Sequence, residues 1–196
     1  MKVLSKITLG VVALFSLCSC GGRGKEATKE EFVEEVNKIK TKDKVFEAKL
    51  TYKQVKTTVV GSSEIKETNK SKGEYKKNPY GEWEAASSNN DATADLLFII
   101  MSRSMDPKGY ISSINETSAS NEDDFKETFY IKPLGYEVSY TMDYTSDGNQ
   151  IINQDNYYEW NDYGYFTCMS GTETIKDKAT NKTVQEIKFE AKITYR

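Results

Sequence analysis

Strict alternation of apolar and polar side chains near both ends of the chain constrains its fold more than any other feature. Residues 46–52 read FEAKLTY and residues 189–195 read FEAKITY, so every second side chain is apolar. A period of two residues is that of a β-strand with one face in a core and the other in water. The two segments therefore predict two amphipathic strands that meet the same packing requirement.

Strand signals continue between these two segments and are separated by turn sequences. NPYG at 78–81, PLG at 133–135, SDGN at 146–149 and NDYG at 161–164 are typical of tight turns. Further strands are expected at 64–77, 82–84, 110–114, 125–131, 137–144, 157–160 and 165–168. Because short turns join most of these segments, the pattern favours antiparallel pairing.

One segment near the start of this pattern predicts a helix. Thr28, followed three residues later by Glu31, is typical of a capping box, which begins a helix. Apolar residues then recur every three or four positions, which gives a helix at 29–40 one buried stripe. The stripe consists of Phe32, Val33, Val36 and Ile39.

A second predicted helix, at 92–104, carries more apolar residues than one sheet face requires. It ends before Pro107, because the residue before a proline avoids helical angles. Its centre, residues 96–101, is apolar on every side. One interpretation is a core helix that loops cover, and the other is a lid whose outer side contacts an apolar ligand. The candidate ligand or lid residues are Leu96, Leu97, Phe98, Ile100 and Met101.

Together these signals predict a single α+β, mostly β domain at 28–196. Its fold would be one curved antiparallel sheet, an open half-barrel, with an N-terminal amphipathic helix and one inserted apolar helix. A domain of this length buries enough surface to fold without disulfides or structural metals.

The first twenty residues predict export and lipid anchoring. Lys2 and Lys6 precede an apolar stretch at 7–17, which suits a secretion signal but is shorter than the ~20 residues of a membrane-spanning helix. The sequence LCSC at 17–20 resembles a bacterial lipobox, which implies diacylglyceryl attachment to the thiol of Cys20 and cleavage just before it.

The lipobox resemblance implies a signal peptide at 1–19, followed by the lipidated Cys20 and a flexible tether at 20–27. It also implies an extracytoplasmic location. The anchor would hold the protein on the bacterial cell membrane, or on the outer membrane of a bacterium with two membranes, through palmitate-type acyl chains.

Composition excludes several classes of function. The chain has 27 basic and 30 acidic side chains, and loss of residues 1–19 removes two lysines and no acid, so no nucleic-acid partner is expected. Histidine is absent, which removes the usual general base of serine and cysteine hydrolases and the commonest zinc ligand. Cys168 has no histidine to activate it and is expected to be a buried or half-buried, inert thiol.

Motifs that could carry catalysis are weak. Ser63 and Lys66 match the Ser-x-x-Lys of penicillin-binding enzymes, but Ser63 lies in a strand or turn signal where those enzymes begin a helix. Several acidic residues lack the spacing of a calcium loop and are interpreted as solvated. These acids are Glu122, Asp123, Asp124, Asp143, Asp147 and Asp155. The chain is therefore not expected to be an enzyme, and no cofactor or metal is expected.

Aromatic residues concentrate in the predicted hairpin around 161–164. Tyrosine and tryptophan suit contacts with proteins, sugars and lipids, but they also suit ordinary packing within a sheet. Both interpretations stay open from the sequence. The candidate contact residues are Tyr157, Tyr158, Trp160, Tyr163 and Tyr165.

The order of these elements resembles that of the LolA-like lipoprotein group, which includes the mycobacterial glycolipid-binding lipoproteins. The shared features are an anchored cysteine, a first amphipathic helix, a long antiparallel meander and a helical insertion between early and late strands. In that group a curved open sheet wraps helices, and many members carry acyl chains in the concavity. The resemblance implies a membrane-anchored, non-enzymatic protein that binds an amphiphile or another apolar ligand. The alternative is an envelope surface module that binds a protein or a glycan and has no ligand cavity.

Overall fold

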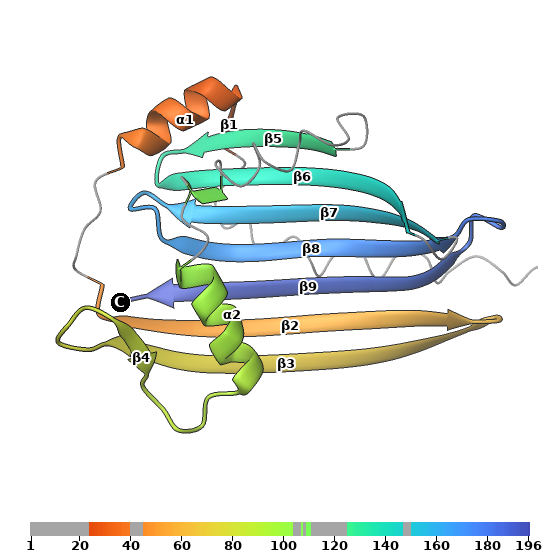
Figure 1. Ribbon diagram of the computed structural model, residues 1–196, viewed down its shortest axis with the longest axis horizontal. Coiled ribbons are helices and arrows are strands. Elements are labelled where there is room, and N and C mark those ends of the chain that lie inside the picture. The colour runs from red at the N-terminus through yellow and green to blue at the C-terminus, as the bar shows by residue number, and fades with distance from the viewer. Residues whose placement is uncertain (1–23, 40–44, 104–106, 108, 111–124, 147–149) are drawn as a thin grey trace, which may run out of the picture.

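Nine strands form a single open antiparallel sheet in the computed structural model of the protein (Figure 1). The structure describes residues 24–39, 45–103, 107, 109–110, 125–146 and 150–196. The strands are β1 (Lys25–Ala27), β2 (Glu47–Val60), β3 (Ser63–Lys77), β4 (Trp83–Ala85), β5 (Phe125–Lys132), β6 (Gly135–Ser146), β7 (Gln150–Asn161), β8 (Phe166–Asp177) and β9 (Thr183–Tyr195). Their order across the sheet is β1-β5-β6-β7-β8-β9-β2-β3-β4. The predicted mostly β, antiparallel fold is confirmed.

The two segments with nearly identical sequences are neighbouring strands in the sheet. Strand β2 pairs with β9 in antiparallel register, with Leu50 opposite Ile193 and Ala48 opposite Tyr195. Residues directly opposite one another share a face of the sheet, so the apolar side chains of both strands enter one core. This pairing joins the early strands β2–β4 to the long meander β5–β9.

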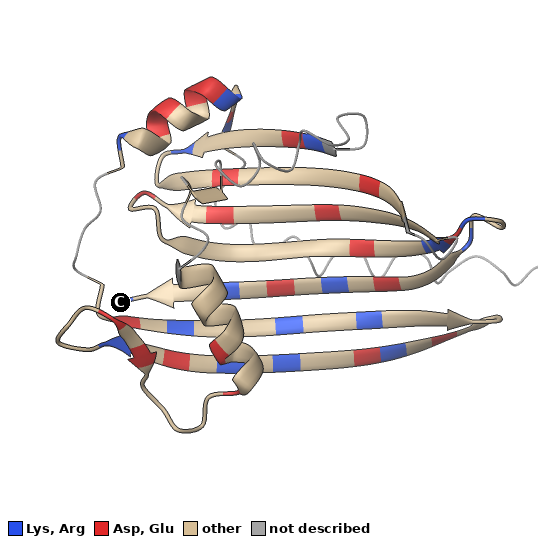
Figure 2. Ribbon diagram, in the orientation of Figure 1, with Lys and Arg blue, Asp and Glu red and all other residues tan. Residues whose placement is uncertain are grey.

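Two helices pack on the same face of the sheet, which we call the inner face (Figure 1). They are α1 (Lys29–Asn37) and α2 (Ala92–Arg103). The core lies between this face and the helices, and its largest fully buried side chains are Trp160, Phe32, Phe98, Phe166, Leu50, Met101, Val36 and Val138. Figure 2 shows that charged residues recur along the strands, as expected where alternate side chains point to opposite faces.

Helix α1 begins with the capping box that the sequence predicts. The Thr28 hydroxyl accepts a hydrogen bond from the Glu31 N–H at 3.2 Å, and the Thr28 N–H donates to the Glu31 carboxylate at 2.9 Å. Phe32 packs against Phe129 of β5, with ring centroids 5.1 Å apart. The helix ends at Asn37, with Lys38 as its C-cap, which is three residues before the predicted end.

Helix α2 belongs to the long connection between strands near opposite edges of the sheet. Strand β4 is one edge, whereas β5 lies next to the edge strand β1. The chain must therefore return across the sheet, and α2 does so over the inner face of β2 and β3 (Figure 1). The connection also contains Tyr110, whose ring lies 5.3 Å from that of Tyr158 and 5.4 Å from that of Trp160 in β7.

Two predicted segments need correction. Residues 25–27, assigned to the tether, form the edge strand β1, in which Lys25 pairs with Ile131 of β5. Tyr110, assigned to a strand at 110–114, is helical, because packing of its ring in the core overrides the strand preference of tyrosine. Residues 111–114, the signal peptide at 1–19, Cys20 and the acids at 122–124 lie outside the described residues.

Candidate functional site

The six consecutive apolar residues of α2 divide between two sides of the helix. Phe98 and Met101 are buried against the sheet, and Leu97 packs partly against the core. On the other side, Leu96, Ile99 and Ile100 are 60%, 48% and 41% exposed. The five candidate lid residues therefore do not line one cavity. The buried side fits the core interpretation, and the exposed side forms the apolar surface that the lid interpretation requires.

Stacked aromatic rings fix the buried side of α2. The ring of Phe98 lies parallel to that of Tyr75 in β3, with a centroid distance of 3.6 Å and an interplanar angle of 6°. Trp83 of β4 meets the same Phe98 ring edge-on at 5.5 Å. The Tyr75 hydroxyl donates a hydrogen bond to Asp95 of α2 at 3.0 Å, and burial together with Asp95 raises the pKa of Tyr75. These contacts fix the rotation of α2 about its own axis and therefore determine which of its sides can contact a ligand.

Helix α2 crosses the strands, so one of its sides faces the ends of the strands and the other faces their middle. Asp95 lies on the side that faces the strand ends, because it accepts a hydrogen bond from Tyr75, near the end of β3 that pairs with β4. Helical residues advance by about 100° each, so Leu97 and Ile100 lie roughly opposite Asp95 around the helix axis. They therefore form an apolar wall beside the part of the inner face that neither helix covers (Figure 1).

Three rows of inner-face side chains run across β2, β9, β8 and β7 next to this wall, and we call them the floor. The register of the strands gives Tyr52, Ala191, Met169 and Tyr158 in the first row, Gln54, Phe189, Gly171 and Asn156 in the second, and Lys56, Ile187, Glu173 and Gln154 in the third. The first row is closest to α2 and is mainly apolar. The next two rows mix apolar side chains with amides and charges, so the floor becomes more polar with distance from α2.

A glycine and an aromatic ring shape the centre of the floor. Gly171 pairs with Phe189, and a Cβ atom at Gly171 would lie 2.9 Å from Cζ of Phe189 and 2.8 Å from the Asp155 carbonyl oxygen. The Phe189 ring therefore lies along the sheet over the glycine instead of standing upright, which leaves a low surface. In the next row, Gln154 donates a hydrogen bond to Glu173 at 2.7 Å.

A hollow beside the start of α2 has a different chemistry. It measures about 540 Å³ and lies over β2, β3 and the loop before α2. Strand alternation places its lysines, Lys53, Lys70 and Lys72, on the outer face of the sheet, with Asp91 and Glu190 nearby. Tyr52, which belongs to the first row of the floor, also lines this hollow, so the hollow adjoins the floor.

The predicted aromatic contact surface is wrong for two of its five residues. Trp160 is 0% exposed, and Tyr158 is buried beside it, because both point from β7 into the core on the inner face. Trp160 packs edge-on against Phe166 with ring centroids 5.3 Å apart. Ordinary sheet packing therefore explains this part of the hairpin. Tyr163 and Tyr165 are half-buried, and Tyr157 points to the outer face.

Tyr157 belongs to a charged cluster on the outer face that sequence patterns do not reveal. Lys132 of β5 forms an ion pair with Glu137 at 2.7 Å and with Glu159 at 3.5 Å, and Glu137 is only 3% exposed. The Tyr157 hydroxyl donates to Glu159 at 3.0 Å, and burial together with Glu159 raises the pKa of Tyr157. Because one lysine serves two partly buried carboxylates, the cluster ties β5, β6 and β7 together.

Comparison with models of protein families and with curated proteins finds no match. The functional argument therefore depends on the geometry of the chain itself.

The remaining sequence candidates have these positions. Cys168 is buried on β8, which decides between the buried and half-buried positions that the sequence left open, and Ser63 begins strand β3 and not a helix. In the part of the chain that the structure describes, no group of three or more acidic or cysteine side chains could hold a metal ion. Neither α1 nor α2 is long and apolar enough to cross a membrane, and only described residues enter this statement.

Sequence reasoning missed the floor. Gln54, Asn156 and Phe189 carry no motif and lie far apart along the chain. The one signal that could have found them is the similarity of 46–52 and 189–195, because pairing those segments would have placed Gln54 opposite Phe189.

Proposed function

We propose that the protein is a non-enzymatic, extracytoplasmic lipoprotein that is anchored through Cys20 and binds an amphiphile on its inner face. The apolar part of the ligand lies against Leu97 and Ile100 of α2 and the first row of the floor. Its polar part lies over the amide and charged side chains of the next two rows. The observation that carries the proposal is the apolar wall of α2, formed by Ile100, which is 41% exposed, and the partly buried Leu97, beside a half-buried, partly apolar sheet face.

The energetics favour an apolar occupant of this site. Full burial of a leucine or isoleucine side chain contributes about 1.5–3 kcal/mol, so covering the exposed part of each α2 side chain contributes about 1 kcal/mol. Contiguous exposed apolar side chains are typical of ligand or partner sites in soluble proteins. An acyl chain can gain this energy without any catalytic group, in agreement with the absence of histidine from the sequence.

The polarity of the floor favours an amphiphile over a wholly apolar ligand. Gln54 and Asn156 lie in the second row, and Gln154 with Glu173 in the third. Amide and carboxylate groups offer hydrogen bonds to hydroxyl, amine or phosphate groups of a polar head. The resemblance of element order to LolA-like lipoproteins supports the same class of ligand.

A titration with a fluorescent lysophospholipid tests the proposal. The Cys20→Ala protein, freed of residues 1–19, would be titrated in aqueous buffer. We expect saturable binding that Ile100→Glu weakens by at least about tenfold, about 1.4 kcal/mol, because a carboxylate would face the acyl chain. Equal affinity of Ile100→Glu and the parent protein would contradict the proposed site.

The matched control is Ile65→Glu. Ile65 is also an exposed isoleucine, but it lies at the far end of β3, away from α2. We expect Ile65→Glu to bind like the parent protein. Equal weakening by both variants would indicate a general effect of charge and not a site beside α2.

A further inference from the structure

We infer that the end of the sheet where β5 turns into β6 faces a lipid bilayer, with the strands directed away from the membrane. We call this end the near end. The inference rests on the lipid anchor of the proposed function but not on its ligand. The partner is the bilayer surface itself, and the contact residues are Phe46, Tyr80 and Leu134.

The edge strand β1 fixes where the tether leaves the fold. Lys25 pairs with Ile131, the next-to-last residue of β5, and a Cβ atom on Gly24 would lie 2.6 Å from the Ile131 carbonyl oxygen. Strand β5 ends one residue later, where Lys132 pairs with Gly135. The described chain therefore starts at the near end.

The length of the tether restricts where the anchor can reach. Gly24 follows Cys20 by four positions, and an extended chain covers at most about 14 Å over that distance. Strand β6 has 12 residues, which corresponds to about 40 Å. A lipid on Cys20 therefore reaches the near end but cannot reach the opposite end of the sheet.

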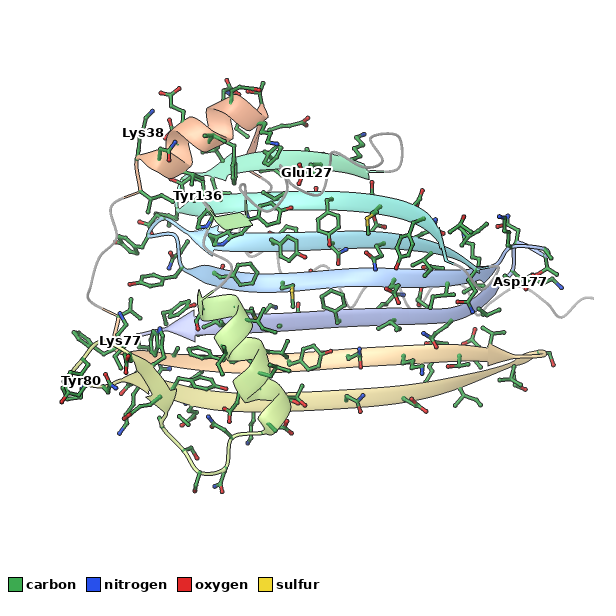
Figure 3. All side chains as sticks on the ribbon, in the orientation of Figure 1. Lys38, Lys77, Tyr80, Glu127, Tyr136 and Asp177 are labelled. Carbon is green, nitrogen blue, oxygen red and sulfur yellow. The ribbon has the colours of Figure 1, made fainter. Side chains whose placement is uncertain are left out.

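Exposed apolar tips occur at the near end. Leu134, in the turn between β5 and β6, is 76% exposed, and Tyr80, in the turn between β3 and β4, is 90% exposed. Phe46 precedes β2, is 61% exposed and donates its N–H to the C-terminal Arg196 carbonyl. Figure 3 shows Tyr80 and Lys77 at this end and Asp177 at the other.

These tips are spread along the near end of the sheet. Strand β6 and strand β3 are separated by five strand spacings, which is about 24 Å along the near end. Tyrosine suits the interface between lipid and water because its ring is apolar and its hydroxyl is polar. Lys77 and Arg196 lie at the same end and suit anionic headgroups.

Exposed apolar residues alone would not choose this end, because Val60 is exposed at the far end. The short tether decides between the two ends, because it lets the lipid on Cys20 reach only the near end. A flat arrangement, with Lys53, Lys70 and Lys72 of the outer face on anionic lipid, would leave Phe46, Tyr80 and Leu134 in water. With the near end on the membrane, these three side chains enter the bilayer and leave water, which is favourable for apolar groups. We therefore propose this upright orientation, in which the strands point away from the membrane.

Depth measurements on the lipidated protein test the orientation. The full chain would be matured in cells and reconstituted into vesicles of phosphatidylcholine and phosphatidylglycerol. In a Cys168→Ala background, a fluorophore would be attached through Leu134→Cys or Tyr80→Cys at the near end. Val60→Cys would serve as the matched apolar control at the far end, and Lys70→Cys would report on the outer face. Quenching by lipids that carry a nitroxide on the acyl chain reports contact with the bilayer.

We expect several-fold stronger quenching at Leu134 and Tyr80 than at Val60 and Lys70. Quenching at Lys70 equal to that at Leu134 would overturn the upright orientation in favour of the flat one. Absence of quenching at Leu134 and Tyr80 would overturn the bilayer contact. The intact mass of the same sample reports diacylglyceryl on Cys20, and its absence would reject the anchor and this inference with it. The lysophospholipid titration uses a protein without the anchor, so either result leaves ligand binding to be judged separately.

Discussion

The ring of Phe98 in α2 lies parallel to the ring of Tyr75 in β3, with the centroids 3.6 Å apart. The stack forms because Gly73, two residues before Tyr75, has no side chain. A Cβ atom on Gly73 would lie 2.7 Å from Cζ of Tyr75, so the tyrosine ring can fold over the glycine and offer its flat face to α2. The position of α2, and with it the exposed apolar side beside the floor, depends on this contact.

Removal of the Phe98 ring should destabilise the whole domain. We expect Phe98→Ala to lower the free energy of unfolding by about 3–5 kcal/mol, because the ring is buried between Tyr75 and Trp83. Urea denaturation followed by far-ultraviolet circular dichroism measures the loss. Ile99→Ala, one residue away on the exposed side, should change the free energy by less than about 1 kcal/mol. Equal losses for the two variants would contradict the position of α2.

A side chain at Gly171 should disturb the floor. In Gly171→Ala the new methyl group would meet the Asp155 carbonyl oxygen and the Phe189 ring, so the backbone and the ring must both move. We expect a loss of about 1–3 kcal/mol in the free energy of unfolding. Ser170→Ala on the outer face is the neighbouring control and should have a much smaller effect. A Gly171→Ala protein as stable as the parent would show that Phe189 does not lie over this position.

The carboxyl group of Glu127 should make stability depend on pH. Burial on the inner face raises its pKa from the ordinary value of 4.5, although the hydrogen bond from Tyr110 and the charge of Lys29 act in the opposite direction. Between the ordinary and the raised pKa the folded state binds more protons than the unfolded state. Stability therefore falls as pH rises through this window.

Comparison with Glu127→Gln isolates this contribution. Glutamine can still accept the hydrogen bond from Tyr110 but does not ionise. We expect the parent protein to lose stability relative to Glu127→Gln as the pH is raised from about 4 to about 7, measured by urea denaturation at each pH. A relative gain of the parent protein over the same range would mean that attraction to Lys29 outweighs burial.

Local patterns predicted most of the fold. Alternation identified β2 and β9, the turn sequences placed the hairpins of the meander, and Thr28 with Glu31 marked the beginning of α1. These features depend on near neighbours along the chain, so the sequence displays them directly.

The features that the sequence analysis predicted wrongly or missed all depend on contacts between residues that are far apart in the sequence. Three residues at 25–27 are too few to show alternation, and they form β1 only because β5 offers them an unpaired edge. Tyr110 is helical because the rings of Tyr158 and Trp160 accept its own ring. Trp160 was predicted as a contact residue because the sequence of a hairpin does not show which face of its strands is buried in the core. The floor was invisible for the same reason, since it arises from the register of four strands.

Native mass spectrometry of the Cys20→Ala protein, purified without added lipid or detergent, tests amphiphile binding most directly. The account predicts a population heavier than the bare chain by the mass of one amphiphile, and the loss of that population in Ile100→Glu but not in Ile65→Glu. A parent protein that carries only its own mass, and that stays unliganded after incubation with lysophospholipid, would contradict the account.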